Sequence, residues 1–181
     1  IKDFKKKVES EMYDRNDLLH LLSDLDDNLE MVYDDMQMIQ PLFKIQRKSI
    51  KDISIKESIA KVVRYFRNDI DNKITTNIDQ ISNDLSVKTN AGLILQILIN
   101  LIDNAIFWLN KSGNPNKQLY FELNSIEKTL IIADNGNGIR EDISPLIFQE
   151  FFTMKSNGRG LGLYIVRELL SRINAEIYVL D

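Results

Sequence analysis

The chain has 181 residues, of which 44% are hydrophobic, a formal net charge of −4 and no cysteine. This length allows one α/β domain with an appended helix, or two small domains. The interspersed charges argue against nucleic-acid binding, and the lack of cysteine with a single histidine argues against disulfides and zinc sites. The longest apolar run, Leu93 to Leu101, is too short to cross a bilayer. Because the chain begins with Ile1 rather than Met, we expect a fragment of a longer protein. We expect this fragment to be cytoplasmic and to make no membrane contact, whereas the full-length protein can be membrane-anchored.

Residues 1–44 are predicted to form one long helix, because they contain no glycine and no proline before Pro41. Its apolar residues alternate at spacings of four and three: Leu18, Leu22, Leu25, Leu29, Val32, Met36, Ile39 and Phe43. This heptad seam is typical of a two-chain coiled coil or a four-helix bundle, although a helix packed on its own domain is the simpler alternative. We favour the former and expect a homodimer through this helix.

Residues 54–181 are predicted to form a second domain that mixes helices and strands. Ser54, with Glu57 three residues later, is the N-cap signature of a helix that has Ile59, Val62, Val63 and Phe66 on one face. Helices are also predicted at 92–110 and 160–173, and the first ends at a glycine- and proline-containing stop signal. Alternating and β-branched residues predict strands at 74–78, 85–87, 119–123, 129–133 and 176–180.

Asn100 and Asn104 lie four residues apart on the predicted helix 92–110 and therefore project in the same direction. Amides on an apolar helix need polar partners, because an unpaired buried amide costs about 1–3 kcal/mol. Hydrogen bonds to the neighbouring backbone would satisfy them, and for the pair alone we favour this interpretation. The alternative is a hard cation that the amide oxygens hold together with waters and phosphates.

Asp134 follows the predicted strand 129–133 and precedes Asn135-Gly136-Asn137-Gly138. Such a tetrapeptide often only closes a turn. The alternative is a base pocket, in which the glycines let a planar ring approach the backbone. A carboxylate that accepts from an exocyclic amine would then select adenine over guanine.

A glycine-rich turn, Gly158-Arg-Gly-Leu-Gly162, leads into the predicted helix 160–173. Turns of this kind present backbone N–H groups and the positive end of the helix dipole to an anion. Lys155 and Arg159 flank this point. We expect buried aromatic rings to anchor one end of a mobile segment just upstream, namely those of Phe148, Phe151 and Phe152.

Four stretches in this order, Asn100–Ala105, Asp134–Ile139, Phe148–Lys155 and Gly158–Leu163, resemble known sequence boxes. They are similar to the N, G1, F and G2 boxes of the superfamily that unites histidine kinases with gyrase, mismatch-repair clamps and ATP-dependent chaperones. The match is strongest to the ATP-binding catalytic domain of sensor histidine kinases and covers residues 54–181. The resemblance implies an α+β fold, a two-layer sandwich with a mixed sheet, in which ATP lies between the helices and a lid.

The resemblance also implies a role for each matching position. Asn104 would be the Mg²⁺ ligand, and Asn100 would assist at the phosphates and the metal. Asp134 would accept from the adenine amino group, and Lys155 would lie near the γ-phosphate. The other ATP-binding positions would shape the base pocket, the lid hinge and the triphosphate loop: Gly136, Gly138, Ile139, Phe148, Gly158, Arg159, Gly160, Leu161 and Gly162.

Two features depart from the resemblance. Phe107 and Trp108 follow the N box where many such kinases have a basic or hydroxyl residue near the phosphates. Packing is the favoured interpretation, and a cover over the nucleotide is the alternative. The single histidine, His20, is followed by Leu21-Leu22-Ser23-Asp24, which does not match the usual acceptor box. A solvated helix histidine is therefore the default, and His20 is retained as a candidate phosphoacceptor.

Asn100 separates kinases from hydrolases in this superfamily. Members that hydrolyse ATP commonly have a glutamate there as the general base, and an amide cannot accept the proton, so we expect phosphoryl transfer. The sequence thus predicts the core of a two-component sensor histidine kinase that binds ATP and Mg²⁺. It would phosphorylate a histidine for relay to the receiver domain of a response regulator. The alternative is an ATP-gated conformational module without autophosphorylation; an empty scaffold is disfavoured because every box retains its polar and glycine positions.

Overall fold

The computed structural model describes residues 18–27, 29, 50–70, 73–81, 83–156 and 158–180. The chain divides into two parts between residues 40 and 41. In the first part, residues 18–27 are helical, as predicted, and Leu18, Leu22 and Leu25 are exposed. Most of the predicted helix 1–44 lies outside the described residues. The dimer, like the boundary between residues 44 and 54, stays a prediction.

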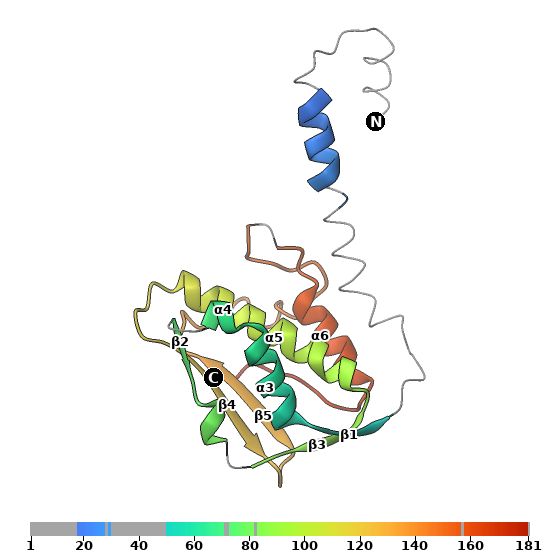
Figure 1. Ribbon diagram of the computed structural model, residues 1–181, viewed down its shortest axis with the longest axis vertical. Helices are drawn as coiled ribbons and strands as arrows, with labels where there is room; N and C mark the ends of the chain where they lie inside the picture. The colour runs from blue at the N-terminus through green and yellow to red at the C-terminus, as the bar shows by residue number, and fades with distance from the viewer. Residues whose placement is uncertain are drawn as a thin grey trace. The chain divides into compact units, whose positions relative to one another are not determined.

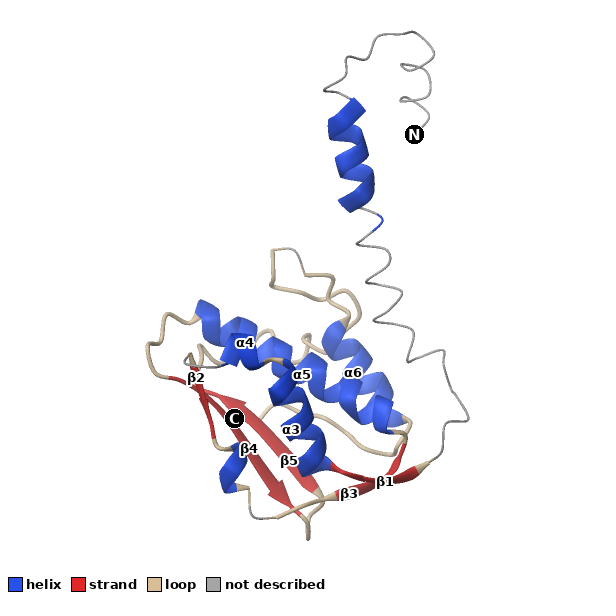
Figure 2. Ribbon diagram, viewed as in Figure 1, coloured by secondary structure: helices blue, strands red, loops and turns tan. Residues whose placement is uncertain are grey.

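The second part alternates helices and strands, which are shown in Figures 1 and 2. Its mixed sheet has the order β2-β4-β5, with β2 parallel to β4 and β4 antiparallel to β5, whereas β1 and β3 form a separate antiparallel pair. The long helices cover one face of the mixed sheet, which confirms the predicted two-layer α+β fold. The elements are β1 (Lys51–Ser54), α3 (Ile55–Tyr65), α4 (Arg67–Ile70), β2 (Ile74–Thr76), the 3₁₀ helix η1 (Ile78–Gln80), β3 (Ser86–Thr89), α5 (Ala91–Lys111), β4 (Lys117–Asn124), β5 (Thr129–Asp134) and α6 (Gly162–Ser171).

Local sequence explains where the helices begin. The hydroxyl oxygen of Ser54 accepts a hydrogen bond from the backbone N–H of Glu57 at 3.0 Å, so Ser54 is the N-cap of α3 as predicted. At α5 the side-chain oxygen of Asn90 accepts from the backbone N–H of Gly92 at 2.7 Å. Both caps satisfy N–H groups that would otherwise lack a partner in the first turn.

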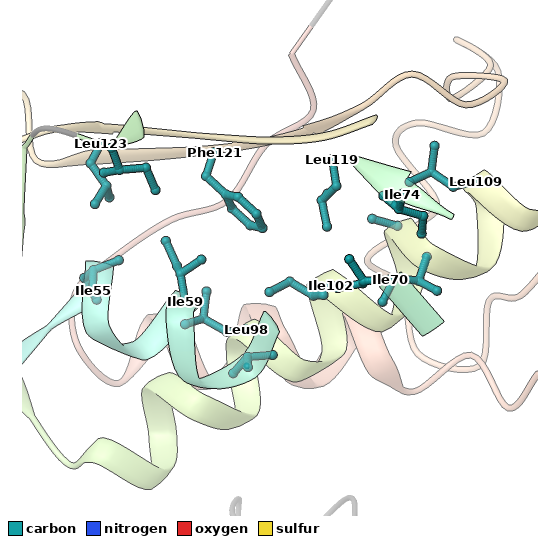
Figure 3. Packing of buried hydrophobic residues seen from close by; sticks show 14 of the residues in the cluster. Ile55, Ile59, Ile70, Ile74, Leu98, Ile102, Leu109, Leu119, Phe121 and Leu123 are labelled. Atoms are coloured by element: carbon teal, nitrogen blue, oxygen red, sulfur yellow. The ribbon is translucent and has the colours of Figure 1, made fainter. Parts of the chain in front are cut away.

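The hydrophobic core lies between the helices and the mixed sheet. Leu119, Phe121 and Leu123 alternate along β4 and point toward the helices, as the period of two in a strand requires. Ile59 of α3 and Ile102 of α5 meet them from the other side (Figure 3). Since α5 packs against α3, α6 and the sheet, it is the central element of the domain.

Ile102→Ala is expected to destabilise the domain by about 2–5 kcal/mol, because the substitution leaves a cavity in a close-packed core. Ile102 is 0% exposed, whereas Ile126, in the turn between β4 and β5, is 92% exposed. Ile126→Ala is therefore the matched control and should change the free energy of unfolding by less than about 0.5 kcal/mol. Urea denaturation followed by circular dichroism measures both. Equal effects of the two substitutions would contradict this placement of the core.

Several strand predictions were inaccurate. The strand predicted at 74–78 ends at Thr76, because Ile78 begins η1, and β1 and α4 were not predicted. The strand predicted at 176–180 is wrong: these residues form no regular element, although Ile177 and Val179 are more buried than their neighbours. An alternating pattern becomes a strand only when a partner strand completes the hydrogen-bonded ladder. The ladders among the described residues join only β1 to β3, β2 to β4 and β4 to β5.

Helix α5 is longer than its longest apolar run suggests. With 21 residues and a mean hydropathy of 1.7, it is long and apolar enough to cross a bilayer by length and composition. In the fold, however, Leu98, Ile102 and Leu109 of α5 are buried against α3 and the sheet. Its hydrophobicity is therefore that of a core helix.

Candidate nucleotide-binding site

The residues of the four boxes meet along one stretch of α5. Asn100 lies beside the first residue of α6, Asp103 and Phe107 contact Lys155, and the backbone of Trp108 lies beside Gly136. From position 100 to position 108 the helix rises about 12 Å. Segments that are far apart in the sequence are thus brought together along two turns of one buried helix.

The side chain of Asn100 is oriented by its own helix. Its Nδ2 atom donates to the carbonyl oxygen of Gln96 at 3.0 Å, the backbone hydrogen bond that was the favoured interpretation for this residue. Its Oδ1 atom faces α6: a Cβ at Gly162 would lie 3.3 Å from it. The amide oxygen therefore lies at the N-terminus of α6, where Leu161 caps the helix without a side-chain hydrogen bond. The exposed N–H groups and the helix dipole at such an end favour a negative charge.

Asp134 is the last residue of β5, and it is exposed. One carboxylate oxygen, Oδ1, accepts from the backbone N–H of Gly136 at 2.9 Å, which folds the following turn back toward the strand. A Cβ at Gly136 would lie 2.7 Å from Asp134 Oδ1 and 3.8 Å from the carbonyl oxygen of Trp108. A side chain at position 136 would therefore clash with the carboxylate that accepts the hydrogen bond of this turn.

Asn135 has a structural role that the sequence did not reveal. Its Oδ1 accepts from the backbone N–H of Gln118 at 2.7 Å, and its Nδ2 donates to the carbonyl oxygen of Asn116 at 2.7 Å. Asn114 donates in turn to the carbonyl oxygen of Asn135 at 3.2 Å. These bonds hold the turn after Asp134 to the start of β4 and to the loop before it. The turn interpretation and the pocket interpretation of this motif are therefore compatible.

The segment from Phe151 to Gly160, here called the lid, closes at its base. Gly160 has a φ of +69°, and a Cβ there would lie 2.2 Å from the carbonyl carbon of Phe151. Only glycine permits this backbone contact between the two ends of the lid. Phe151 also has a positive φ of 63°, and it is 68% exposed. The expectation that its ring is buried as an anchor is therefore wrong, whereas Phe148 and Phe152 are half-buried.

Lys155 connects the lid to α5. Its Nζ atom lies 3.5 Å from Asp103 Oδ2 and 4.3 Å from the centre of the Phe107 ring. The Lys155 side chain is 24% exposed and that of Asp103 is 59% exposed. Sequence reasoning did not select Asp103. Its only signal was its place one residue before Asn104, and nothing in the sequence pairs it with a lysine 52 positions away.

The remaining predicted positions include residues of the loop after β5 and of the lid. Ile139 is exposed in the loop after β5, and Gly138 there has a φ of +69°. In the same loop Arg140 donates to Asp142, and this charge-assisted hydrogen bond lowers the pKa of the Asp142 carboxyl group. Arg159 is half-buried in the lid, and Gly158 donates to the carbonyl oxygen of Lys155 at 2.9 Å.

Two hollows in the domain lie elsewhere. One, of about 480 Å³, is lined by the start of β2 and the loop before β4, and the other, of about 530 Å³, lies beside α3 and η1. Residues of the four boxes line neither hollow. We assign the site to the stretch of α5 because the amide, carboxylate and ammonium groups converge there.

Residues 89–181 match the model of the family described as histidine kinase-, DNA gyrase B- and HSP90-like ATPase, which is about half of the chain. The chain belongs to this family. Its relatives include the signal transduction histidine-protein kinase AtoS of Escherichia coli (strain K12), 30% identical over 103 residues, which cover 56% of this chain and 17% of AtoS. The sensor protein KdpD of Clostridium acetobutylicum is 31% identical over 129 residues, which cover 68% of this chain and 14% of KdpD.

The solved structures support the same assignment. The catalytic domain of the histidine kinase ThkA is 27% identical, with a TM-score of 0.52, over 68% of this chain and 82% of that chain. The chain therefore carries the ATP-binding catalytic domain of a histidine kinase. It spans less than a fifth of the length of the two curated relatives named above.

Proposed function

We propose that this chain is the kinase core of a two-component sensor histidine kinase, in which Mg-ATP binds along α5. Asp134 and Gly136 would receive the adenine at one end of the stretch. Asn100, Asn104 and the N-terminus of α6 would receive the phosphates at the other. The observation that carries the proposal is the convergence of the turn after Asp134, the lid and α6 on this one helix.

The proposed metal role of Asn104 rests on the chemistry of its side chain. Asn104 is half-buried on α5, four residues after Asn100. Among the described residues no three His, Cys, Asp or Glu side chains gather into a metal site. Mg²⁺ commonly keeps several waters and takes few protein ligands when it also binds phosphates, so an amide oxygen suits it. When bound, the ion would neutralise charge on the phosphates.

The proposed reaction is transfer of the γ-phosphoryl group to a histidine. The bond from the γ-phosphorus to the bridging oxygen breaks, ADP leaves, and a neutral imidazole nitrogen forms the new bond to phosphorus. Asn100 supports transfer over hydrolysis, because its amide cannot act as the base that activates water. We further propose relay to an aspartate of a response-regulator receiver domain, a homodimer through the N-terminal helix, and a cytoplasmic location.

Incubation of the chain with γ-labelled ATP and Mg²⁺ tests transfer. We expect acid-labile, base-stable label on the chain, and its loss in His20→Ala if His20, exposed on the helix 18–27, is the acceptor. Asn104→Ala should lower labelling by about a hundredfold or more, the scale of a lost electrostatic contact to the transferring group. If the His20→Ala variant still becomes labelled, another residue is the phosphoacceptor.

A second function remains a candidate: an ATP-gated module in which nucleotide binding orders the lid without phosphotransfer. The contacts of Gly160 with Phe151 and of Lys155 with α5 favour it, because they give the lid a defined arrangement that a ligand can change. Nucleotide binding without label on the chain, and without label on an added histidine-containing acceptor domain, would support the gated module and contradict the kinase.

A further inference from the structure

Phe107 is an aromatic residue that faces the lid rather than the hydrophobic core. It is half-buried on α5, one turn after Asp103, and it does not belong to the core cluster between the helices and the sheet. The Nζ atom of Lys155 lies 4.3 Å from the centre of its ring, well within the range of a cation–π interaction. The two residues are 48 positions apart in the sequence, so the contact links the lid to the helix.

Asp103 makes a second contact with Lys155. It lies four residues before Phe107, on the same side of α5. Its Oδ2 atom is 3.5 Å from Nζ of Lys155, so carboxylate and ring hold one ammonium group together. An ion pair this exposed contributes little by itself. The ring adds attraction where Lys155 is partly withdrawn from water, because cation–π contacts strengthen as the cation is desolvated.

The contact lies next to the residues that we assign to the phosphates. Asn104 follows Asp103 directly and is one helical turn from Phe107, so these side chains share one side of α5. Lys111, one turn beyond, has its own Nζ atom 5.9 Å from the centre of the same ring. The ammonium groups of Lys155 and Lys111 therefore both lie near the Phe107 ring, at the edge of the candidate site.

We propose that Phe107 is a positioning residue that, with Asp103, forms a seat holding Lys155 at the phosphate end of the site before nucleotide arrives. This inference rests on the proposed function. The lysine is the group that would meet the γ-phosphate, and the seat removes most of the conformational freedom that it would otherwise lose on binding. Such pre-organisation raises affinity by lowering the entropy cost of association. Phe107 thus acts through Lys155 and favours ligands with a third phosphate.

The first experiment compares the binding of Mg-ATP and Mg-ADP to the full chain by titration calorimetry. Phe107→Leu should weaken Mg-ATP binding about fivefold, the equivalent of about 1 kcal/mol, with a smaller effect on Mg-ADP. Phe107→Tyr retains the ring and should restore nearly normal binding. In a Lys155→Met background, Phe107→Leu should have no further effect on Mg-ATP binding. Thermal unfolding confirms that each variant is folded.

The second experiment needs no nucleotide and measures the seat directly. The rate of amine acetylation at Lys155, followed by mass spectrometry, should rise at least about threefold in Phe107→Leu, because a seated ammonium group is held away from the reagent. Asp103→Asn, at an exposed position, should raise it in the same direction without altering packing. The exposed lysines Lys88 and Lys128 are internal references whose rates should not change.

The outcomes separate the seat from the proposed function. An unchanged Lys155 acetylation rate in both variants would overturn the seat, even if the wild-type chain transfers label. Tighter Mg-ATP binding by Phe107→Leu, or equal weakening with and without Lys155, would overturn the positioning role. Absence of phosphotransfer with a raised acetylation rate and a selective loss of Mg-ATP affinity would instead contradict the kinase and leave the seat supported.

Discussion

Asparagine in place of Asp134 will weaken Mg-ATP binding by about ten- to a hundredfold, the range for loss of a hydrogen bond to a charged group. Oδ1 of Asp134 accepts from the backbone N–H of Gly136, and an asparagine oxygen retains that bond, so the turn is kept. The second carboxylate oxygen becomes an NH₂ group, which would oppose the amino group of adenine instead of accepting from it. Titration calorimetry with Mg-ATP measures the change in Kd.

Asp69→Asn is the matched control for Asp134→Asn. Asp69 is an exposed acidic residue on α4, so its substitution changes the net charge equally on an element that supplies none of the proposed site residues. It should leave Mg-ATP affinity unchanged, and Asp134→Asn should not alter thermal unfolding. If Asp134→Asn binds Mg-ATP as tightly as the wild-type chain does, adenine does not bind at this carboxylate.

Alanine at Gly160 will weaken Mg-ATP binding by about tenfold or more, because a strained backbone site of this kind costs about 1–3 kcal/mol and the clash adds to it. The added Cβ would lie 2.2 Å from the carbonyl carbon of Phe151 and 2.6 Å from the backbone nitrogen of Phe152. Since both atoms belong to the backbone, the two ends of the lid must separate. The lid then opens at its base and moves the turn before α6 away from the phosphates.

Gly113→Ala separates the effect of the steric clash at position 160 from the free-energy cost of placing alanine at a positive φ. Gly113 has the same φ of +69°, but apart from its own atoms and those of its two chain neighbours, no atom of the described residues lies within 4 Å of the position of its Cβ. It follows α5 outside the lid, so its substitution should cost stability alone and leave Mg-ATP affinity unchanged. If the two alanine variants bind Mg-ATP equally well, closure of the lid base does not contribute to nucleotide binding.

The elements predicted best are those whose signals are local. The helix predicted at 92–110 is α5, Ala91–Lys111, because its apolar residues and its stop signal lie within the segment itself. Ser54 was identified as an N-cap for the same reason, since the cap and its partner Glu57 are three residues apart. The family was also evident, because each of its four boxes is a short contiguous motif.

The strand errors have a common cause. β1 was missed at Lys51–Ser54, where the sequence is highly charged, yet it pairs with β3 at Ser86–Thr89. The strand expected at 176–180 has the alternating pattern but no partner among the described strands. Whether a strand forms depends on a partner segment that can be distant in the chain, and no local pattern contains that information.

The chemical groups of the candidate site can be read from the amino-acid sequence: the amides of Asn100 and Asn104, the carboxylate of Asp134 and the glycines around the lid. Their neighbours become visible in the folded domain. It places Lys155 on Asp103 and Phe107, and Gly160 against Phe151. A motif consists of residues that are close together in the sequence, so it can be recognised there. Contacts between segments depend on how the long helices pack on the sheet. This packing depends on all of the core residues together.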